Sequence, residues 1–179
     1  MNPAPNLVLV GPMGAGKTSI GRRLASQLGL EFVDADQRLE QLVGTTVSLI
    51  FELEGETGFR MREAQLLGEL LRGRNQVIAT GGGAVLSPVT RELLSQHSFV
   101  VYIRVGIQQQ LDRLARDHTR PLLAGGDRRE KLETLAAMRN PLYQSVADLV
   151  FESDGLSVGS AAKKVCAQVQ AQWRREEAA

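Results

Sequence analysis

The sequence predicts an α/β fold with a mainly parallel sheet. Short apolar runs rich in Val and Ile alternate along the chain with longer segments of helical periodicity. Two of these runs, LVLV (7–10) and FVVYI (99–103), lack the polar alternation of a half-exposed strand. Strands that are buried on both faces have this composition. Strands that alternate with helices predict βαβ units, and therefore a sheet whose strands are mainly parallel.

Five segments are predicted to be strands. In chain order they are LVLV (7–10), EFVDA (31–35), QVIAT (76–80), FVVYIRV (99–105) and DLVF (148–151). The alternation continues from the first strand to the last without a linker, a repeat or a low-complexity tract. We therefore expect one domain that spans residues 1–179.

Six longer segments are predicted to be helices. They are residues 18–29, 58–73, 87–96, 107–116, 127–139 and 159–175. In the first segment, Ile20, Leu24 and Leu28 recur at intervals of four residues. A glycine then follows at position 29, where a helix commonly stops. The third segment opens with Ser-Pro, a pair typical of a helix cap and first turn.

Composition and charge restrict the class of protein. The 179 residues include 21 Lys and Arg and 20 Asp and Glu, which gives a net charge of +1. A general binder of nucleic acid or of membrane surfaces needs a dense positive field, so we expect neither partner. The single cysteine, Cys166, cannot form an internal disulfide, which fits a reducing compartment. The N-terminus lacks a signal-peptide pattern, and no apolar run is long enough to span a membrane, so we expect a cytoplasmic protein.

The segment GPMGAGKT, residues 11–18, matches the phosphate-binding pattern G-x-x-x-x-G-K-[ST] in full. A predicted strand precedes it and a predicted helix follows it. Its glycines allow backbone N–H groups to point at phosphate oxygens, and the helix N-terminus adds positive potential. We expect Lys17 to reach the outer phosphates and Thr18 to ligate Mg²⁺. The predicted ATP-binding residues of this loop are Gly14, Ala15, Gly16, Lys17, Thr18 and Ser19.

The sequence also restricts the fate of the phosphate. No Asp is followed by Gly at the third position beyond it, and Asn-Lys-x-Asp is absent, which argues against a GTPase. The length is that of a small phosphotransferase rather than of a motor or transporter ATPase. A kinase for a small hydroxy acid such as gluconate, a nucleotide kinase and a non-catalytic protein that senses ATP are the alternatives at this point.

Six motifs give the chain a resemblance to a known family. The segments GPMGAGKTSIGRRLA, FVDAD, FELEGETGFRMRE, ATGGGAV, RPLL and RNPLY resemble those of the shikimate kinases, in that family's order, over residues 6–155. The resemblance implies a three-layer α/β sandwich of the P-loop kinase type, with a five-stranded parallel sheet and a mobile lid at about residues 116–128. It also implies transfer of phosphate from ATP to the 3-hydroxyl of shikimate, in chorismate and aromatic amino-acid biosynthesis, with Mg²⁺ as cofactor. We expect a monomer whose partners are these two small molecules.

Two carboxylates follow the second predicted strand. Asp34 and Asp36 are two residues apart, so in an extended chain they share one side. The resemblance implies that Asp34 acts on Mg²⁺, commonly through water, and that Asp36 binds substrate hydroxyls. Asp36 is the better candidate for accepting the proton of the attacking hydroxyl. The alternative is a surface turn capped by an aspartate.

The resemblance assigns the acceptor's carboxylate to two arginines, Arg60 and Arg139. A planar guanidinium binds a carboxylate through two parallel hydrogen bonds, which suits this task. From spacing alone, Arg60 is equally compatible with a surface ion pair to Glu63, three residues later on a helix. In the motif, Glu63 orients Arg60.

Three consecutive glycines follow the third predicted strand. Gly81, Gly82 and Gly83 carry no side chains, so a ligand can approach their backbone N–H groups closely. The resemblance implies that this loop contacts shikimate. The alternative is a flexible turn between a strand and a helix.

The basic segment at 117–129 interrupts the regular pattern with Pro121, Gly125 and Gly126, which indicates a loop that could serve as a lid. By resemblance, Arg120 closes over the phosphates as a catalytic residue and also binds ATP. Arg113 matches the position that stacks on adenine. Other arginines of this segment, Arg128 among them, are interpreted as solvated charges.

Overall fold

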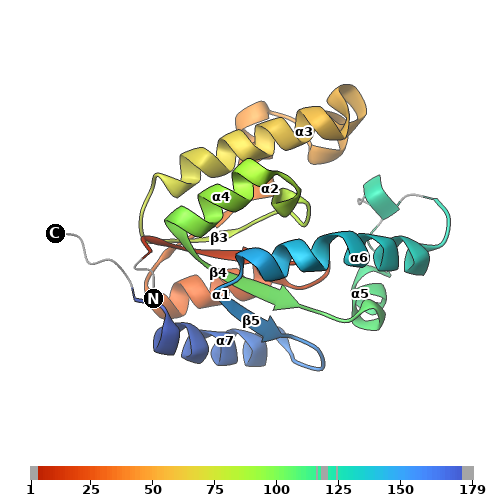
Figure 1. Cartoon of the computed structure of the whole chain (residues 1–179). Coiled ribbons are helices and arrows are strands. Elements are labelled where there is room, and N and C mark those ends of the chain that lie inside the picture. The colour runs from red at the N-terminus through yellow and green to blue at the C-terminus, as the bar shows by residue number, and fades with distance from the viewer. Residues whose placement is uncertain (1–3, 116, 118–120, 124, 175–179) are drawn as a thin grey trace.

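The computed structural model describes residues 4–115, 117, 121–123 and 125–174. Five strands form the central sheet, and each pair of neighbouring strands is parallel. The strands are β1 (Asn6–Val10), β2 (Glu31–Asp34), β3 (Gln76–Ala79), β4 (Ser98–Arg104) and β5 (Leu149–Glu152). Their order across the sheet is β2-β3-β1-β4-β5 (Figure 1). The five predicted strands are confirmed, with small shifts at their ends.

Helices cover both faces of this sheet. The helices are α1 (Lys17–Leu28), α2 (Ala35–Val43), α3 (Val47–Leu71), α4 (Pro88–His97), α5 (Ile107–Leu114), α6 (Arg128–Val146) and α7 (Val158–Gln172), with short 3₁₀ helices η1 (Ala84–Leu86) and η2 (Pro121–Leu123). One layer contains α1 and α7, and the other contains α3, α4 and α6 (Figure 1). The predicted three-layer α/β sandwich is therefore confirmed. No helix in the described ranges is long and apolar enough to cross a membrane.

The central strand β1 explains why the apolar runs lack polar alternation. Leu7 and Leu9 pack into the core on the side of α1 and α7, whereas Val8 and Val10 pack into the core on the opposite side. All four side chains are completely buried. Because helices cover both faces of this strand, it has no position that favours a polar residue.

Helix α2 was not predicted, and it changes the interpretation of the two carboxylates. Asp34 caps this helix, because its Oδ1 accepts a hydrogen bond of 3.1 Å from the backbone N–H of Gln37. The helix begins at Ala35, so Asp36 lies in its first turn. The prediction that Asp34 and Asp36 share one side of an extended chain is therefore wrong.

Two other helices are longer than predicted. Helix α3 begins at Val47 rather than at residue 58, and it contains a kink at Gly55, where φ is 70°. A glycine adopts this left-handed conformation without the steric cost of a Cβ. Helix α6 continues through Pro141 to Val146, beyond the predicted end at residue 139.

The strand order places three chain segments side by side at the carboxyl edge of the sheet. The phosphate-binding loop follows β1, Asp34 ends β2, and the three glycines follow β3. Since β2, β3 and β1 are neighbours, these segments meet at one edge. Ligands of open parallel sheets bind at this edge.

Candidate functional site

The loop between β1 and α1 requires glycine at both positions that the motif specifies. Gly16 has a φ of 89°, in the left-handed region that favours glycine. A Cβ at Gly11 would overlap the carbonyl oxygen of Ile103. Gly11 also has a positive φ, of 146°, so it is needed both for its conformation and for space, whereas Gly16 is needed for its conformation.

Lys17 lies folded over this loop. Its Nζ donates hydrogen bonds to the carbonyl oxygens of Gly11, at 2.7 Å, and Pro12, at 2.9 Å. The residue is largely buried, yet it contributes to the wall of the cavity above the loop. The loop thus holds a positive charge at the place where the outer phosphates of a nucleotide are expected.

Thr18 and Asp34 bring a hydroxyl and a carboxylate together beside the loop. Thr18 Oγ1 donates a hydrogen bond of 2.6 Å to Asp34 Oδ2. Magnesium prefers such oxygen ligands and usually keeps several waters or phosphates as well. The described residues contain no group of three or more His, Cys, Asp or Glu side chains that could enclose a metal. The pair therefore fits an ion that is bound mainly by phosphates and water.

A large cavity of about 720 Å³ opens over the loop. The predicted residues in its wall are Gly14, Gly16, Lys17, Thr18, Ser19, Asp34, Asp36, Gly81, Gly82 and Arg113. Arg113 comes from α5, and its Nη1 donates a hydrogen bond of 2.9 Å to the carbonyl oxygen of Gly14. Ala15 is fully buried and is not part of this wall. We call this space the donor cavity.

A smaller cavity of about 70 Å³ lies beside it, and we call it the acceptor cavity. Its wall contains Met13, Asp36, Val47, Phe51, Phe59, Arg60, Glu63, Gly81, Gly82, Gly83, Leu122 and Arg139. Five of these residues, Met13, Asp36, Val47, Gly81 and Gly82, also line the donor cavity. The two cavities therefore adjoin, with Asp36 in the wall of both.

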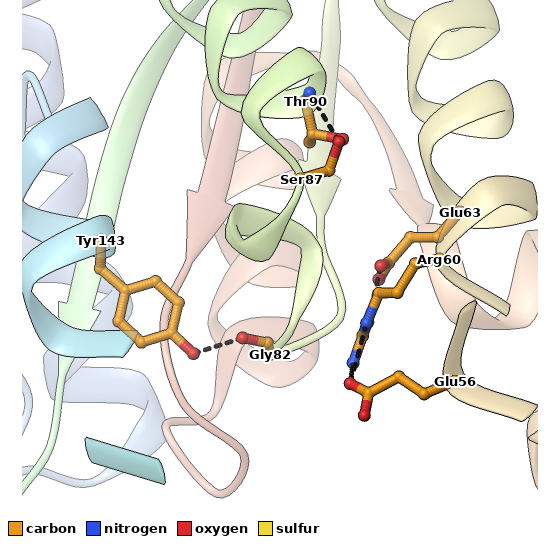
Figure 2. Close-up of polar contacts among 7 residues, drawn as sticks. All are labelled: Glu56, Arg60, Glu63, Gly82, Ser87, Thr90 and Tyr143. Carbon is orange, nitrogen blue, oxygen red and sulfur yellow. Dashed lines mark hydrogen bonds and ion pairs between the residues drawn. The ribbon is translucent and has the colours of Figure 1, made fainter. Parts of the chain in front are cut away.

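Arg60 projects from α3 and is held by acidic and aromatic neighbours. Its Nη1 lies 2.6 Å from Glu63 Oε2, and its Nη2 lies 3.3 Å from Glu56 Oε1 (Figure 2). Its guanidinium carbon lies 5.0 Å from the ring centroid of Phe59 and 5.9 Å from that of Phe51. The ion pair with Glu63 therefore exists, but it lies in a cavity wall rather than on the open surface.

Arg139 projects from α6 on another side of the acceptor cavity. It is only 4% exposed, and its Nε has no hydrogen-bond partner within the described part of the chain. A buried arginine with an unpaired N–H is costly unless an anion or another acceptor compensates it. Arg60 and Arg139 therefore give this small cavity two cations that suit an anionic ligand.

Two of the three loop glycines leave room for neighbouring protein side chains. A Cβ at Gly81 would lie 2.6 Å from Glu63 Oε1 and 2.9 Å from Asp36 Oδ1. A Cβ at Gly83 would overlap the guanidinium of Arg60. At Gly82 a Cβ would make only ordinary contacts of 3.5 Å or more. The loop therefore packs closely against the charged residues, and Gly82 is its most open position.

Comparison with known proteins identifies the family. A family model described as "Shikimate kinase" matches residues 13–170. The chain belongs to the shikimate kinase family. It is 50% identical to the shikimate kinase of Stenotrophomonas maltophilia (strain R551-3), over 99% of this chain and 98% of that protein. It is 55% identical to that of Xanthomonas euvesicatoria pv. vesicatoria (strain 85-10), over 97% of each.

Solved structures of shikimate kinases have the same fold. The enzyme from Acinetobacter baumannii, solved in complex with shikimate, superposes with a TM-score of 0.91 at 44% identity and covers 94% of each chain. The enzyme from Bacteroides thetaiotaomicron gives a TM-score of 0.85 at 29% identity, over 92% of this chain and 98% of that chain. A sugar kinase from Janibacter sp. HTCC2649 shares the fold alone, with a TM-score of 0.63 at 16% identity.

The predicted site residues lie in the walls of these cavities, with two exceptions, Ala15, which is buried, and Arg120. Arg120 lies outside the described residues. Arg128, which was interpreted as a solvated charge, donates hydrogen bonds to the carbonyl oxygens of Leu114, at 2.7 Å, and Asp117, at 2.5 Å. That interpretation is wrong, because Arg128 ties the start of α6 to the end of α5.

Sequence reasoning gave no role to some residues that build the site. Phe51 and Val47 line the acceptor cavity from the part of α3 that was not predicted. Tyr143 belongs to the family motif RNPLY, and its hydroxyl donates a hydrogen bond to the carbonyl oxygen of Gly82 (Figure 2). The cap at Asp34, with Gln37 three residues later, was the sequence signal that could have revealed α2.

Proposed function

We propose that this chain transfers the terminal phosphoryl group of ATP to the 3-hydroxyl of shikimate. The observation that carries the proposal is the adjacency of the two cavities, one over a phosphate-binding loop and one lined by two arginines and Asp36. Family membership and the similarity to a shikimate kinase in complex with shikimate support the same substrates. The product feeds chorismate and aromatic amino-acid biosynthesis.

On the donor side, the backbone of Gly14, Ala15 and Gly16 binds the phosphates of ATP. Lys17 contacts the outer phosphates, and Ser19 contacts an inner one. Arg113, which already lies against the loop, stacks on adenine. Arg120 supplies a further positive charge from the lid, at about residues 116–128. An arginine in such a position is worth on the order of 10³–10⁵ in rate in phosphoryl-transfer enzymes.

Thr18 and Asp34 hold Mg²⁺ in this proposal, Thr18 directly and Asp34 through water. The close hydroxyl–carboxylate pair in the wall of the donor cavity supports this assignment. When bound, the ion neutralises phosphate charge and orients the outer phosphates. Asp34 also caps α2, so the carboxylate is already fixed in direction by the backbone.

On the acceptor side, Arg60 and Arg139 bind the carboxylate of shikimate. Asp36 and the loop formed by Gly81, Gly82 and Gly83 bind its hydroxyl groups. This division follows from the chemistry of the wall, where two arginines and two carboxylates, Asp36 and the Glu63 that is paired with Arg60, lie around a small space. A nucleotide acceptor would need side chains that recognise its base. The arginines, the carboxylates and the glycine loop of this wall suit a hydroxylated acid better.

Asp36 is proposed to accept the proton of the 3-hydroxyl as its oxygen attacks the terminal phosphorus of ATP. The new bond joins that oxygen to phosphorus, while the bond from phosphorus to the bridging oxygen breaks and ADP leaves with the electron pair. Positioning and charge stabilisation provide most of the catalysis in reactions of this class. Lys17 and Arg120 stabilise the negative charge on the transferred group.

We also infer that residues 1–179 form one domain and that the protein acts as a cytoplasmic monomer. The uninterrupted alternation of strands and helices around one sheet supports the first inference. Neither nucleic acid nor a membrane is needed as a partner for the proposed reaction. Gel filtration with light scattering tests the oligomeric state directly.

A coupled assay of ADP release tests the function. With ATP and Mg²⁺ present, we expect release to depend on shikimate and to stay at background with gluconate or a nucleoside monophosphate. Omission of Mg²⁺ should abolish the signal. If another acceptor supported turnover while saturating shikimate did not, the substrate assignment would be wrong.

A further inference from the structure

Tyr143 connects the hydrophobic core to the glycine loop of the acceptor cavity. It lies one helical turn after Arg139 in α6, and only 1% of the residue is exposed. Its ring packs against that of Tyr102, with ring centroids 5.1 Å apart. Its hydroxyl donates a hydrogen bond to the carbonyl oxygen of Gly82 (Figure 2). Packing in the core therefore fixes the ring of Tyr143 in a position from which its hydroxyl contacts the glycine loop.

This hydrogen bond fixes a peptide plane in the cavity wall. The carbonyl oxygen of Gly82 and the N–H of Gly83 belong to one planar trans peptide and point in opposite directions. A contact that holds the carbonyl also sets the direction of that N–H. The carbonyl oxygens of Gly81 and Gly83 accept hydrogen bonds of 3.2 and 3.0 Å from N–H groups at the following η1 helix. The contact from Tyr143 comes instead from a different helix.

Tyr143 also lies beside Arg139, so one helix presents both side chains to the loop. Nη1 of Arg139 lies 3.6 Å from the position that a Cβ at Gly82 would take. Burial raises the pKa of Tyr143, and the nearby Arg139 lowers it only in part. The Tyr143 hydroxyl therefore stays protonated near neutral pH and keeps its proton for Gly82.

Figure 2 shows Gly82 of the glycine loop between the side chains of Tyr143 and Arg60. Tyr143 reaches Gly82 from α6 on one side, and Arg60 extends from α3 on the other. Tyr143 is not part of the wall of the acceptor cavity, so it acts on a ligand there only through the loop.

We propose that Tyr143 is a positioning residue for the acceptor, because its hydroxyl holds the Gly82–Gly83 peptide in the orientation that binds the hydroxylated ring beside Arg139. The identity of the acceptor in this proposal rests on the proposed function. The hydrogen bond itself and its effect on the loop do not.

Tyr143→Phe tests the proposal, because it keeps the ring in the core and removes only the hydroxyl. The lost hydrogen bond leaves a buried carbonyl without its partner, so we expect the KM for shikimate to rise about five- to twentyfold. The KM for ATP should stay within about twofold of wild type, and kcat should fall less than the KM for shikimate rises. Because KM does not depend on the amount of active enzyme, partial unfolding of the variant would not imitate this result.

Tyr102→Phe is the matched control. Tyr102 belongs to the same ring pair, and its hydroxyl donates a hydrogen bond of 3.2 Å to Asn140 Oδ1 rather than to the loop. A purely structural role for these hydroxyls predicts similar changes in both variants. An unchanged KM for shikimate in Tyr143→Phe, or an equal rise in Tyr102→Phe, would overturn the proposal.

Hydrogen exchange provides a second measurement that needs no substrate. The N–H groups of Ala84 and Leu86 donate to the carbonyl oxygens of Gly81 and Gly83, so their exchange reports on the order of the loop. In Tyr143→Phe, we expect exchange over residues 81–86 to become about five- to tenfold faster, with no such change in Tyr102→Phe. Unchanged exchange would refute the positioning role even if shikimate proved not to be the acceptor. Faster exchange in an enzyme that ignores shikimate would refute the proposed function alone.

Discussion

Arg60 and Glu63 form an ion pair that is almost completely removed from water. Nη1 of Arg60 lies 2.6 Å from Oε2 of Glu63, and the two side chains are 15% and 4% exposed. Burial raises the pKa of Glu63, Arg60 opposes this shift, and the charge of Asp36 adds to it. The other oxygen of Glu63, Oε1, has no hydrogen-bond partner among the residues that the structure describes. Arg60 therefore offsets the cost of burying the Glu63 charge only in part.

Replacing Glu63 with Gln should make the free energy of unfolding fall less as the pH rises. A carboxyl group with a raised pKa in the folded state contributes most when it is protonated, at or below its ordinary pKa of 4.5. This contribution is lost as the pH rises through the folded pKa. We therefore expect Glu63→Gln to gain stability relative to wild type as the pH rises above the ordinary pKa of 4.5 and through the raised pKa of the folded state. Urea unfolding at a series of pH values measures this difference.

Glu54→Gln is the control for that experiment. Glu54 is exposed on the same helix, and a hydrogen bond from Arg62 lowers its pKa. This variant should show no gain with rising pH. Parallel pH curves for wild type and Glu63→Gln would contradict the prediction.

Arg60→Lys should weaken acceptor binding, because an ammonium group cannot reproduce the two parallel hydrogen bonds of a guanidinium. We expect the KM for shikimate to rise about tenfold or more, with little change in the KM for ATP. Arg62→Lys alters an exposed ion pair with Glu54 and should change neither constant by more than about twofold. Equal effects of the two substitutions would argue against the assignment of Arg60.

Lys17→Met should abolish phosphoryl transfer while leaving the acceptor cavity intact. Removing a fixed charge at the outer phosphates lowers kcat by about 10³-fold, as expected for the loss of transition-state stabilisation. Binding of shikimate, measured by calorimetry, should stay near the wild-type value. Lys163→Met, an exposed position in α7, should behave as wild type. A variant at Lys17 with normal turnover would refute the donor assignment.

Gly82→Ala and Gly83→Ala should differ, although the two residues are adjacent. A Cβ at Gly83 would overlap the guanidinium of Arg60, so that side chain must move and the KM for shikimate should rise about tenfold or more. A Cβ at Gly82 fits within the protein, so stability should change by less than about 1 kcal/mol. Thermal unfolding and acceptor kinetics on both variants measure the contrast. A larger loss of stability in Gly82→Ala would contradict it.

Thr18→Ala should raise the Mg²⁺ concentration needed for half-maximal activity about tenfold, because it removes a direct ligand in the proposed site. Thr18→Ser keeps the hydroxyl and should restore most of the activity. Asp34→Ala is a less specific test, since Asp34 also caps α2 and its loss costs about 1 kcal/mol of stability. An unchanged Mg²⁺ dependence in Thr18→Ala would remove Thr18 from the metal site.

The sequence predicted the sheet well, because strands covered on both faces require continuous apolar runs. It predicted α2 and the start of α3 poorly. The run at 31–35 was extended one residue too far, since Ala35 begins α2, and the second role of Asp34 as the cap of that helix was missed. Gly55 and Gly58 are poor helix formers, so the segment before residue 58 was not predicted to be helical. In the structure α3 includes both glycines and is kinked at Gly55.

The motifs identified the charged residues of the site but not the contacts that hold these residues and the glycine loop in place. Spacing could relate Arg60 to Glu63 because both lie on one helix, three residues apart. It could not relate Tyr143 to Gly82, which are 61 residues apart and meet only after α6 packs on the sheet. Nor could it show that Gly81 and Gly83 serve neighbouring side chains, because that requirement arises from packing.

The wall that the donor and acceptor cavities share has a consequence for inhibition. Since Met13, Asp36, Val47, Gly81 and Gly82 border both spaces, a single synthetic molecule can extend from one cavity into the other. Such a bisubstrate compound would join a nucleoside polyphosphate to a carboxylated ring through a short linker. Binding of one end would then present the other at an effective concentration of about millimolar or higher. The geometry thus favours linked ligands over separate analogues of either substrate.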